Sequence, residues 1–318
     1  MNRMNIHRAT AGAALALSLA AFGATSGPAS AHGVAGARIF VTTLQIDDPS
    51  VADEMSLPTV TLQRSGANGG PGPIYNTTLA GEFVKRITEN FALGISSAVV
   101  SVNTLNDKRR IGFNNIVLNA KYRAYVNPEH EFVMSVGVSR QFGTTGSTKI
   151  DAPRVSSTSP NFYFGKGLGD LPIGYLRPLA VTGQLSYAIS ERGPKTDSLG
   201  NFNNGFNNRW NGGITLQYSM QYLRSQVKDF GFPEWVSRVT PLVEFGWSSP
   251  TRPNDTPMQL VIAPGFAYSG DSWQFTAEAL IPANKNSGTN IGFMFQFHLF
   301  FDDLFPNTLG KPVVEWFR

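Results

Sequence analysis

The sequence predicts an all-β fold, a closed antiparallel transmembrane β-barrel of about twelve strands that follows a cleaved signal peptide. Three observations predict it: an export signal at the N-terminus, segments about ten residues long in which apolar and polar side chains alternate, and connections that alternate between short and long. Cysteine is absent, so the exported chain must be held by its core or by closure of its hydrogen-bond ladder.

The first residues have the parts of a secretory signal peptide. Arg3 and Arg8 make the start basic, and a short apolar run follows over residues 11–22. Ala29 and Ala31 supply the small-x-small pattern that signal peptidase needs, so we expect cleavage after Ala31 and a mature chain that starts at His32. The apolar run is shorter than the roughly 20 residues of a spanning helix, which disfavours a retained anchor.

Alternation is clearest over residues 214–222. Every even position from Ile214 to Tyr222 is apolar or aromatic, and every odd position is polar. Because side chains alternate across a strand, one face is apolar and the other can face water. Strands of a soluble β-sandwich also alternate, but they usually have about five or six residues. The longer segments here, with aromatic residues near their ends, favour a membrane barrel.

The same pattern places the other strands. We expect them near Val60 and over about 79–88, 91–102, 113–126, 131–142, 161–168, 176–190, 209–223, 237–248, 257–268, 273–282 and 289–301. Turn-forming residues make short links at 88–90, 127–130 and 270–272, and longer polar links cover 103–112, 143–160, 191–208 and 249–257. Short periplasmic turns and longer outer loops are the arrangement of bacterial outer-membrane barrels, which predicts that location.

The chain is accordingly divided into four parts. Residues 1–31 are the signal peptide, 79–301 the transmembrane barrel, and 302–318 a C-terminal tail. Residues 32–78 form an N-terminal segment, in which Arg38–Ile46 is either a first strand or a portion that enters the lumen. Residues 66–73 are rich in glycine and proline and are expected to be a flexible link.

Strand parity assigns a set of polar side chains to the lumen, because a charge at mid-strand cannot face lipid cheaply. The set is Glu82, Lys121, Arg123, Gln184, Gln217, Glu244, Glu278 and His298. These residues either line a transport path or form salt bridges that plug a narrow barrel. Sequence parity leaves both possibilities open.

No catalytic, metal or cofactor site is expected. The chain has four histidines, and its serines lie in no G-x-S-x-G nucleophile elbow that could partner His298. No H-x-H or H-x-x-x-H spacing accompanies His32, and the string from Gly165 to Asp170 lacks the spacing of a phosphate loop. A formal net charge of +4 without a basic run gives no reason to expect a nucleic-acid partner.

Three stretches carry a resemblance to a known family: the acidic element at 46–59, LPIGYLRPLAVTGQLSYAIS at 171–190, and the C-terminal run at 260–301. On these stretches the chain resembles the outer-membrane proteins grouped as the MetA-pathway phenol-degradation or transporter-like family. The resemblance implies a barrel that moves small, often hydrophobic molecules, and it carries no catalytic residues. One departure is that the last strand ends at Phe301, whereas the chain continues to Trp316, Phe317 and Arg318.

These features favour an outer-membrane channel or transporter for small solutes, with hydrophobic or aromatic cargo as a possibility. The alternative is a structural or ligand-binding barrel with a plugged lumen; an outer-membrane enzyme comes third and a soluble periplasmic β-protein fourth. The expected partners are outer-membrane lipid, a small-molecule solute and the barrel-assembly machinery. The sequence does not indicate an oligomeric state.

Overall fold

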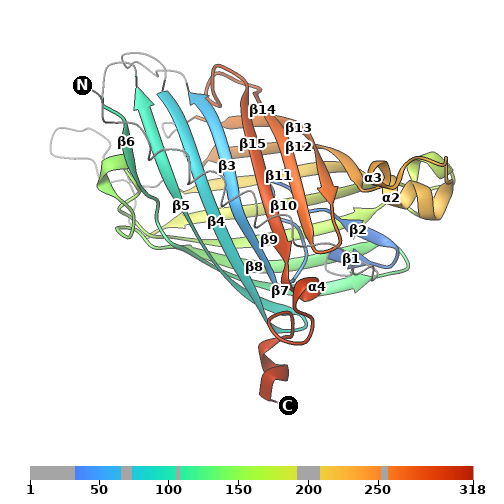
Figure 1. The fold of residues 1–318 in the computed structure, drawn as a ribbon. Coiled ribbons are helices and arrows are strands. Elements are labelled where there is room, and N and C mark those ends of the chain that lie inside the picture. Colours follow the sequence, from blue (N-terminus) through green and yellow to red (C-terminus); the bar gives the residue numbers. More distant parts are fainter. Residues whose placement is uncertain (1–32, 66–73, 105–107, 192–207, 252–256, 318) are drawn as a thin grey trace, which may run out of the picture.

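The computed structural model describes residues 33–65, 74–104, 108–191, 208–251 and 257–317, and Figure 1 shows their arrangement. Twelve strand positions form a closed antiparallel barrel. The strands are β3 (Glu54–Ser65), β4 (Ile74–Thr88), β5 (Phe91–Thr104), β6 (Arg110–Phe113), β7 (Val117–Asn127), β8 (Phe132–Gln141), β9 (Ser157–Gly167), β10 (Leu179–Ser190), β11 (Arg209–Tyr218), β12 (Val239–Pro250), β13 (Gln259–Ser269), β14 (Trp273–Pro282) and β15 (Gly292–Phe300).

From β3 to β5 and from β7 to β15, each strand pairs with the next one along the chain. The pairing of the last strand, β15, with the first, β3, closes the ring. The short strand β6 and the longer β7 both pair with β5 at different heights, so together they fill one position. Closure leaves no free sheet edge, which is what a β-structure in hydrocarbon requires.

The predicted alternation holds in the barrel wall. In β11, Ile214 and Leu216 are 47% and 42% exposed on the outside, whereas Thr215 and Gln217 are 0% and 2% exposed on the inside. Leucine, isoleucine and phenylalanine side chains lie exposed in the same way on the outer face of the other strands. The wall therefore presents an apolar exterior and a polar interior.

Several strand boundaries differ from the sequence-based expectation. The barrel begins at Glu54 and not at residue 79, because the strand expected near Val60 is its first strand, β3. The alternation of β3 is interrupted at Pro58, where the pairing on both sides shifts register. The strand expected over 209–223 ends at Tyr218, since the Ser219 hydroxyl accepts from the backbone N–H of Tyr222 and starts a helix. The strand expected over 113–126 is β7, which begins at Val117, and β6 lies mostly in the stretch 103–112 that was expected to be a polar link.

Small elements complete the two ends of the barrel. They are η1 (Thr148–Ile150), η2 (Gly174–Leu176), α2 (Met220–Tyr222), η3 (Leu223–Val227), α3 (Glu234–Ser237), α4 (Phe301–Leu304) and η4 (Val313–Phe317). No helix in the described part of the chain is long and apolar enough to cross a bilayer. Before the barrel, β1 (Gly33–Ala35) and β2 (Arg38–Phe40) form a separate two-stranded hairpin.

The ends of the barrel differ. One end has the tight turns between β4 and β5, between β7 and β8 and between β13 and β14, together with the longer connections 168–178 and 219–238. The start of β3 and the end of β15 lie at the same end. The opposite end carries, among the described residues, the connection 142–156 between β8 and β9 and the connection 283–291 between β14 and β15. We refer to these as the short-turn end and the long-loop end.

Candidate functional site: the barrel lumen

Residues 33–53, which we call the lumen segment, lie inside the barrel. Their atoms bond to strands from all around the ring, including β4, β7, β8, β10, β11, β12 and β14. A chain of this length can reach opposite walls only from within. Figure 1 shows β1 and β2 between the front and back walls. Of the two expectations for Arg38–Ile46, the structure shows the lumen-entering one, with only the three residues of β2 in a strand.

The segment starts at the short-turn end. Gly36 turns the β1–β2 hairpin with φ +65°, and a Cβ there would lie 2.3 Å from the carbonyl oxygen of Pro128, so glycine is required twice over. Arg38 is fully buried; it donates to Glu131 at 3.0 and 3.1 Å and to the Pro178 carbonyl at 2.9 Å. Its guanidinium also lies 3.9 Å from the ring centroid of Tyr222. These contacts fix the segment to the rim.

The middle of the segment is held by wall side chains that bond its backbone. The Gln217 side chain accepts from the Val41 N–H at 3.3 Å and donates to the Val41 carbonyl at 3.2 Å, as a neighbouring strand would. Gln274 donates to the Thr42 carbonyl at 2.6 Å. Since a buried backbone group needs a partner, the wall amides replace the sheet that this stretch lacks.

The segment turns back at its tip, Gln45–Asp47. The Gln45 N–H donates to Glu244 at 2.8 Å, and the Asp47 N–H donates to Gln184 at 3.0 Å. On the return, Lys121 pairs with the Asp47 carboxylate at 2.8 Å and donates to the Asp48 carbonyl at 3.0 Å. The tip is thus bound on two sides of the lumen, by β10 and β12 on one side and by β7 on the other.

The segment leaves the lumen at Asp53, which is fully buried among cations. Its carboxylate accepts from Lys85 at 2.5 Å and from the Arg86 side chain at 3.0 Å. The C-terminal tail binds the same group: Asp302 accepts from the Asp53 N–H at 2.9 Å and pairs with Arg86 at 3.2 Å. Lys85 also donates to two tail carbonyls, at 2.8 and 2.7 Å. Segment, wall and tail therefore meet in one ion-pair network.

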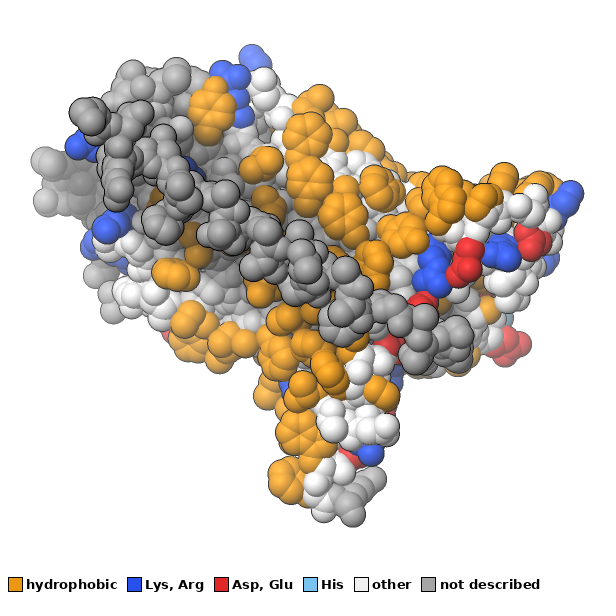
Figure 2. Space-filling model, viewed as in Figure 1, with side chains coloured by type: hydrophobic (Ala, Val, Ile, Leu, Met, Phe, Trp, Pro, Cys, Tyr) orange, Lys and Arg blue, Asp and Glu red, His pale blue; other side chains and the backbone are white. Residues whose placement is uncertain are grey.

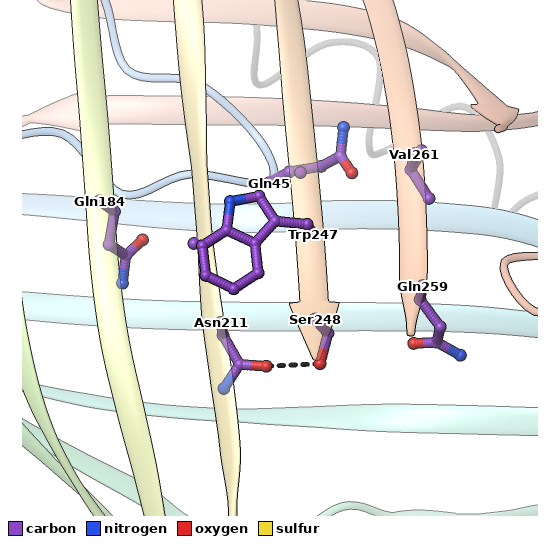
Figure 3. A pocket seen from close by; sticks show the side chains of 9 residues that line it. Gln45, Gln184, Asn211, Trp247, Ser248, Gln259 and Val261 are labelled. Atoms are coloured by element: carbon purple, nitrogen blue, oxygen red, sulfur yellow. Dashed lines mark hydrogen bonds between the residues drawn. The ribbon is translucent and has the colours of Figure 1, made fainter. Parts of the chain in front are cut away.

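A cavity of about 280 Å³ lies between the tip and the long-loop end. It is lined by Gln45, Gln184, Asn211, Gly212, Gly246, Trp247, Ser248, Gln259 and Val261, none of which carries a charge. Figure 3 shows amide side chains from β10, β11, β13 and the tip around it, with Asn211 accepting from the Ser248 hydroxyl at 2.6 Å. The indole of Trp247 lies across β11, where it covers Gly212.

The eight polar residues assigned by parity do not share one environment. Lys121, Gln184, Gln217 and Glu244 bond the lumen segment, as described above. Glu278 is buried beside Glu244, and Glu82 accepts from Asn119 at 2.8 Å. His298 is buried and pairs through Nε2 with Glu54 at 3.0 Å.

Arg123 lies apart from the others, at the short-turn end. Its guanidinium donates to the side chain of Asn90 at 2.9 and 3.0 Å and to the Glu89 carbonyl at 3.0 Å, so it ties down the β4–β5 turn. It shares this end with the rim contacts of Arg38 and lies away from the cavity. The predicted cleavage site, Ala29, Ala31 and His32, lies outside the described residues.

Sequence parity did not single out the glycines that make room for the segment. A Cβ on Gly165 would lie 3.0 Å from Pro49 and 3.1 Å from Phe40, and one on Gly213 would lie 2.5 Å from Ile46. Glycine inside a strand often marks close approach of another backbone. Glycines at inward positions of β9, β11 and β12 were therefore a readable signal for something inside the barrel.

Comparison with solved structures supports the fold. The chain is similar to an outer-membrane channel from Pseudomonas putida F1, with a TM-score of 0.55 and 12% identity over 79% of this chain and 96% of that one. It is less similar to the KdgM porin, with a TM-score of 0.43 and 12% identity over 77% and 98% of the two chains. The NanC porin gives a TM-score of 0.46 and 12% identity over 77% and 98%.

Neither protein-family models nor curated proteins give a match to this sequence. The resemblance to the MetA-pathway family therefore stays a prediction. At this level of identity the structural likeness establishes the fold alone. That fold is the closed antiparallel twelve-strand barrel of bacterial outer-membrane proteins.

Proposed function

We propose that this protein is an outer-membrane channel for small neutral polar solutes and that the lumen segment closes it in the conformation described here. The observation that carries the proposal is the uncharged, amide-lined cavity beside a tip that bonds to the wall on two sides of the lumen. Placement in the outer membrane, with the short-turn end in the periplasm, is part of the proposal and follows from the loop asymmetry of such barrels.

The chemistry of the cavity favours hydroxyl-bearing neutral molecules. Glutamine and asparagine amides both donate and accept, so they match hydroxyl groups in either role. A charged solute would find no opposite charge among the lining residues and would lose hydration without compensation. The hydrophobic or aromatic cargo implied by the family resemblance would contact Val261 and the Trp247 indole there, but it would leave the lining amides without hydrogen-bond partners.

A permanently plugged barrel is the second candidate function. The anchoring of the segment favours it, because Arg38, Val41, Gln45, Asp47 and Asp53 each bond the wall. In that case the cavity would serve binding at the cell surface, without passage.

A deletion of residues 33–52 separates the two candidates. The deleted chain keeps β3–β15 and is checked for folding by heat-modifiable migration on a gel. If the segment is a gate, the full chain shows small or intermittent conductance in planar bilayers, and the deletion shows large steady conductance. Liposome swelling then compares uncharged sugars with charged sugars and with aromatic solutes of similar size.

The expected result is faster entry of uncharged sugars, through the full chain as well as through the deletion. A folded full chain that passes no solute, while the deletion does, would establish the permanently plugged barrel instead. Preferential entry of aromatic solutes would contradict the assignment of neutral polar cargo.

A further inference from the structure

Two connections at the short-turn end form a projection with an exposed apolar surface. We call it the lobe; it comprises residues 168–178 between β9 and β10 and residues 219–238 between β11 and β12. Its exposed apolar side chains are Ile173, Tyr175, Leu176, Phe230, Phe232 and Trp235, of which Trp235 is 63% exposed. Helices α2 and α3 project sideways from the barrel at this place (Figure 1).

The aromatic side chains of the lobe pack into an ordered row. The rings of Tyr175 and Phe230 stack at 6.2 Å between centroids, and those of Phe230 and Phe232 stack at 5.7 Å. The Arg224 guanidinium donates to Ser237 at 3.3 Å, which ties η3 to α3. The apolar surface is therefore a built face rather than the tip of a loose loop.

This face continues the outer wall of the barrel. Tyr218 has the parity of the outward residues Ile214 and Leu216, and its hydroxyl donates to the Tyr175 carbonyl at 3.1 Å. Figure 2 shows hydrophobic side chains along the upper edge of the projection, running into those of the adjoining wall, and Lys, Arg, Asp and Glu side chains below that edge. The lobe carries the ion pairs Arg224–Asp229 and Arg238–Glu234.

We infer that the lobe lies in the headgroup region of the periplasmic leaflet, with its aromatic row against lipid and its ion pairs toward the periplasm. An aromatic and apolar face opposite a charged face is the property of elements that lie in the plane of a membrane interface. Tyrosine and tryptophan, here Tyr175 and Trp235, prefer this depth because an apolar ring and a polar OH or NH group suit the two sides of the boundary. Continuity with the lipid-facing wall identifies lipid as the occupant.

The inference rests on the proposed membrane placement, so its test includes a probe for each. The chain has no cysteine, and single labelling sites can be introduced freely. The variants Trp235→Cys and Phe232→Cys each place the dye on the lobe. Ile214→Cys reports the barrel wall, and Glu129→Cys reports an exposed turn at the same end of the barrel. Each full-length variant carries an environment-sensitive dye in phosphatidylcholine–phosphatidylglycerol vesicles.

At positions 235 and 232 we expect a nitroxide near the lipid headgroup to quench the dye more strongly than a deep nitroxide does. Iodide should quench the dye at these positions several-fold less than at position 129. Position 214 should be quenched most by the deep nitroxide. If the deep nitroxide quenches position 214 most but iodide quenches the lobe as strongly as position 129, the inference about the lobe is wrong and the membrane placement stands. Protection of the lobe from both iodide and lipid quenchers overturns it too, because a second copy then covers the face. Failure at position 214 overturns the membrane placement itself.

Discussion

At the scale of single residues, amide side chains of the barrel wall make the hydrogen bonds to the lumen segment that a neighbouring strand would make. Gln217 is the clearest example, since one amide serves both the N–H and the carbonyl of Val41. Such contacts hold in place a segment that has no sheet of its own.

Replacing Gln217 by leucine should loosen the segment. Two buried backbone groups of Val41 would lose their partner, each at a cost of about 1–3 kcal/mol. We expect faster hydrogen exchange of the Val41 amide and a higher fraction of open time in bilayer recordings. Gln63→Leu is the matched control, because Gln63 donates to the Ser287 carbonyl and does not bond the segment. Equal effects of the two substitutions would remove Gln217 from its assigned role.

At the scale of elements, the C-terminal tail and the lumen segment are coupled at the short-turn end. The tail is anchored through Asp302 in α4 and through the carbonyls of Leu309 and Lys311, which both accept from Lys85. The same lysine holds Asp53, the last residue of the segment. Movement of either element therefore disturbs the other.

The docking of the tail should depend on pH through Asp302. Burial, partly offset by Arg86 and reinforced by the charge of Asp53, raises the pKa of Asp302 to about 7. A raised pKa means that the docked state prefers the protonated carboxyl. Its stabilising contribution is complete below the ordinary pKa of an aspartate and is lost as pH rises through about 7.

The docking of the tail is measured by hydrogen exchange of the amides in residues 301–312, corrected for the intrinsic effect of pH on exchange. We expect less protection at pH 8 than at pH 5.5, and little difference between the two in Asp302→Asn, which keeps an acceptor for the Asp53 N–H. A pH dependence that persists in the asparagine variant would assign the effect to another group.

At the scale of the whole molecule, the outer apolar wall decides where the protein resides. If the wall faces a bilayer, the free-energy cost of placing a charge on it should be largest at the bilayer midplane and small near the membrane surface. Arginine in place of Ile214, at the middle of β11, should destabilise the barrel by about 2–4 kcal/mol, and arginine in place of Trp210, near the strand end, by about 0–1 kcal/mol. Urea unfolding of the protein from phosphatidylcholine vesicles measures both. Equal costs at the two positions would contradict a bilayer around the wall.

Period-two alternation determined the closed barrel, its strand number and most strand limits, because the pattern depends only on neighbours along one strand. Ile214 and Gln217 fall on the expected faces for this reason. The pattern failed where a local cap competed with it: Met220 and Tyr222 continue the alternation, yet the Ser219 hydroxyl turns the chain into a helix. It also missed most of the extent of β3, which Pro58 interrupts.

The sequence by itself determined the barrel and the polar character of its interior, since both follow from side-chain parity and from the cost of unpaired backbone in lipid. Only the tertiary structure decided what fills that interior. The lumen segment bonds to residues far from it in the chain, such as Gln217 and Gln274, and its fit depends on the absence of side chains at Gly165 and Gly213. Such contacts produce no periodic pattern in the sequence, because they join residues that come together only when the barrel closes.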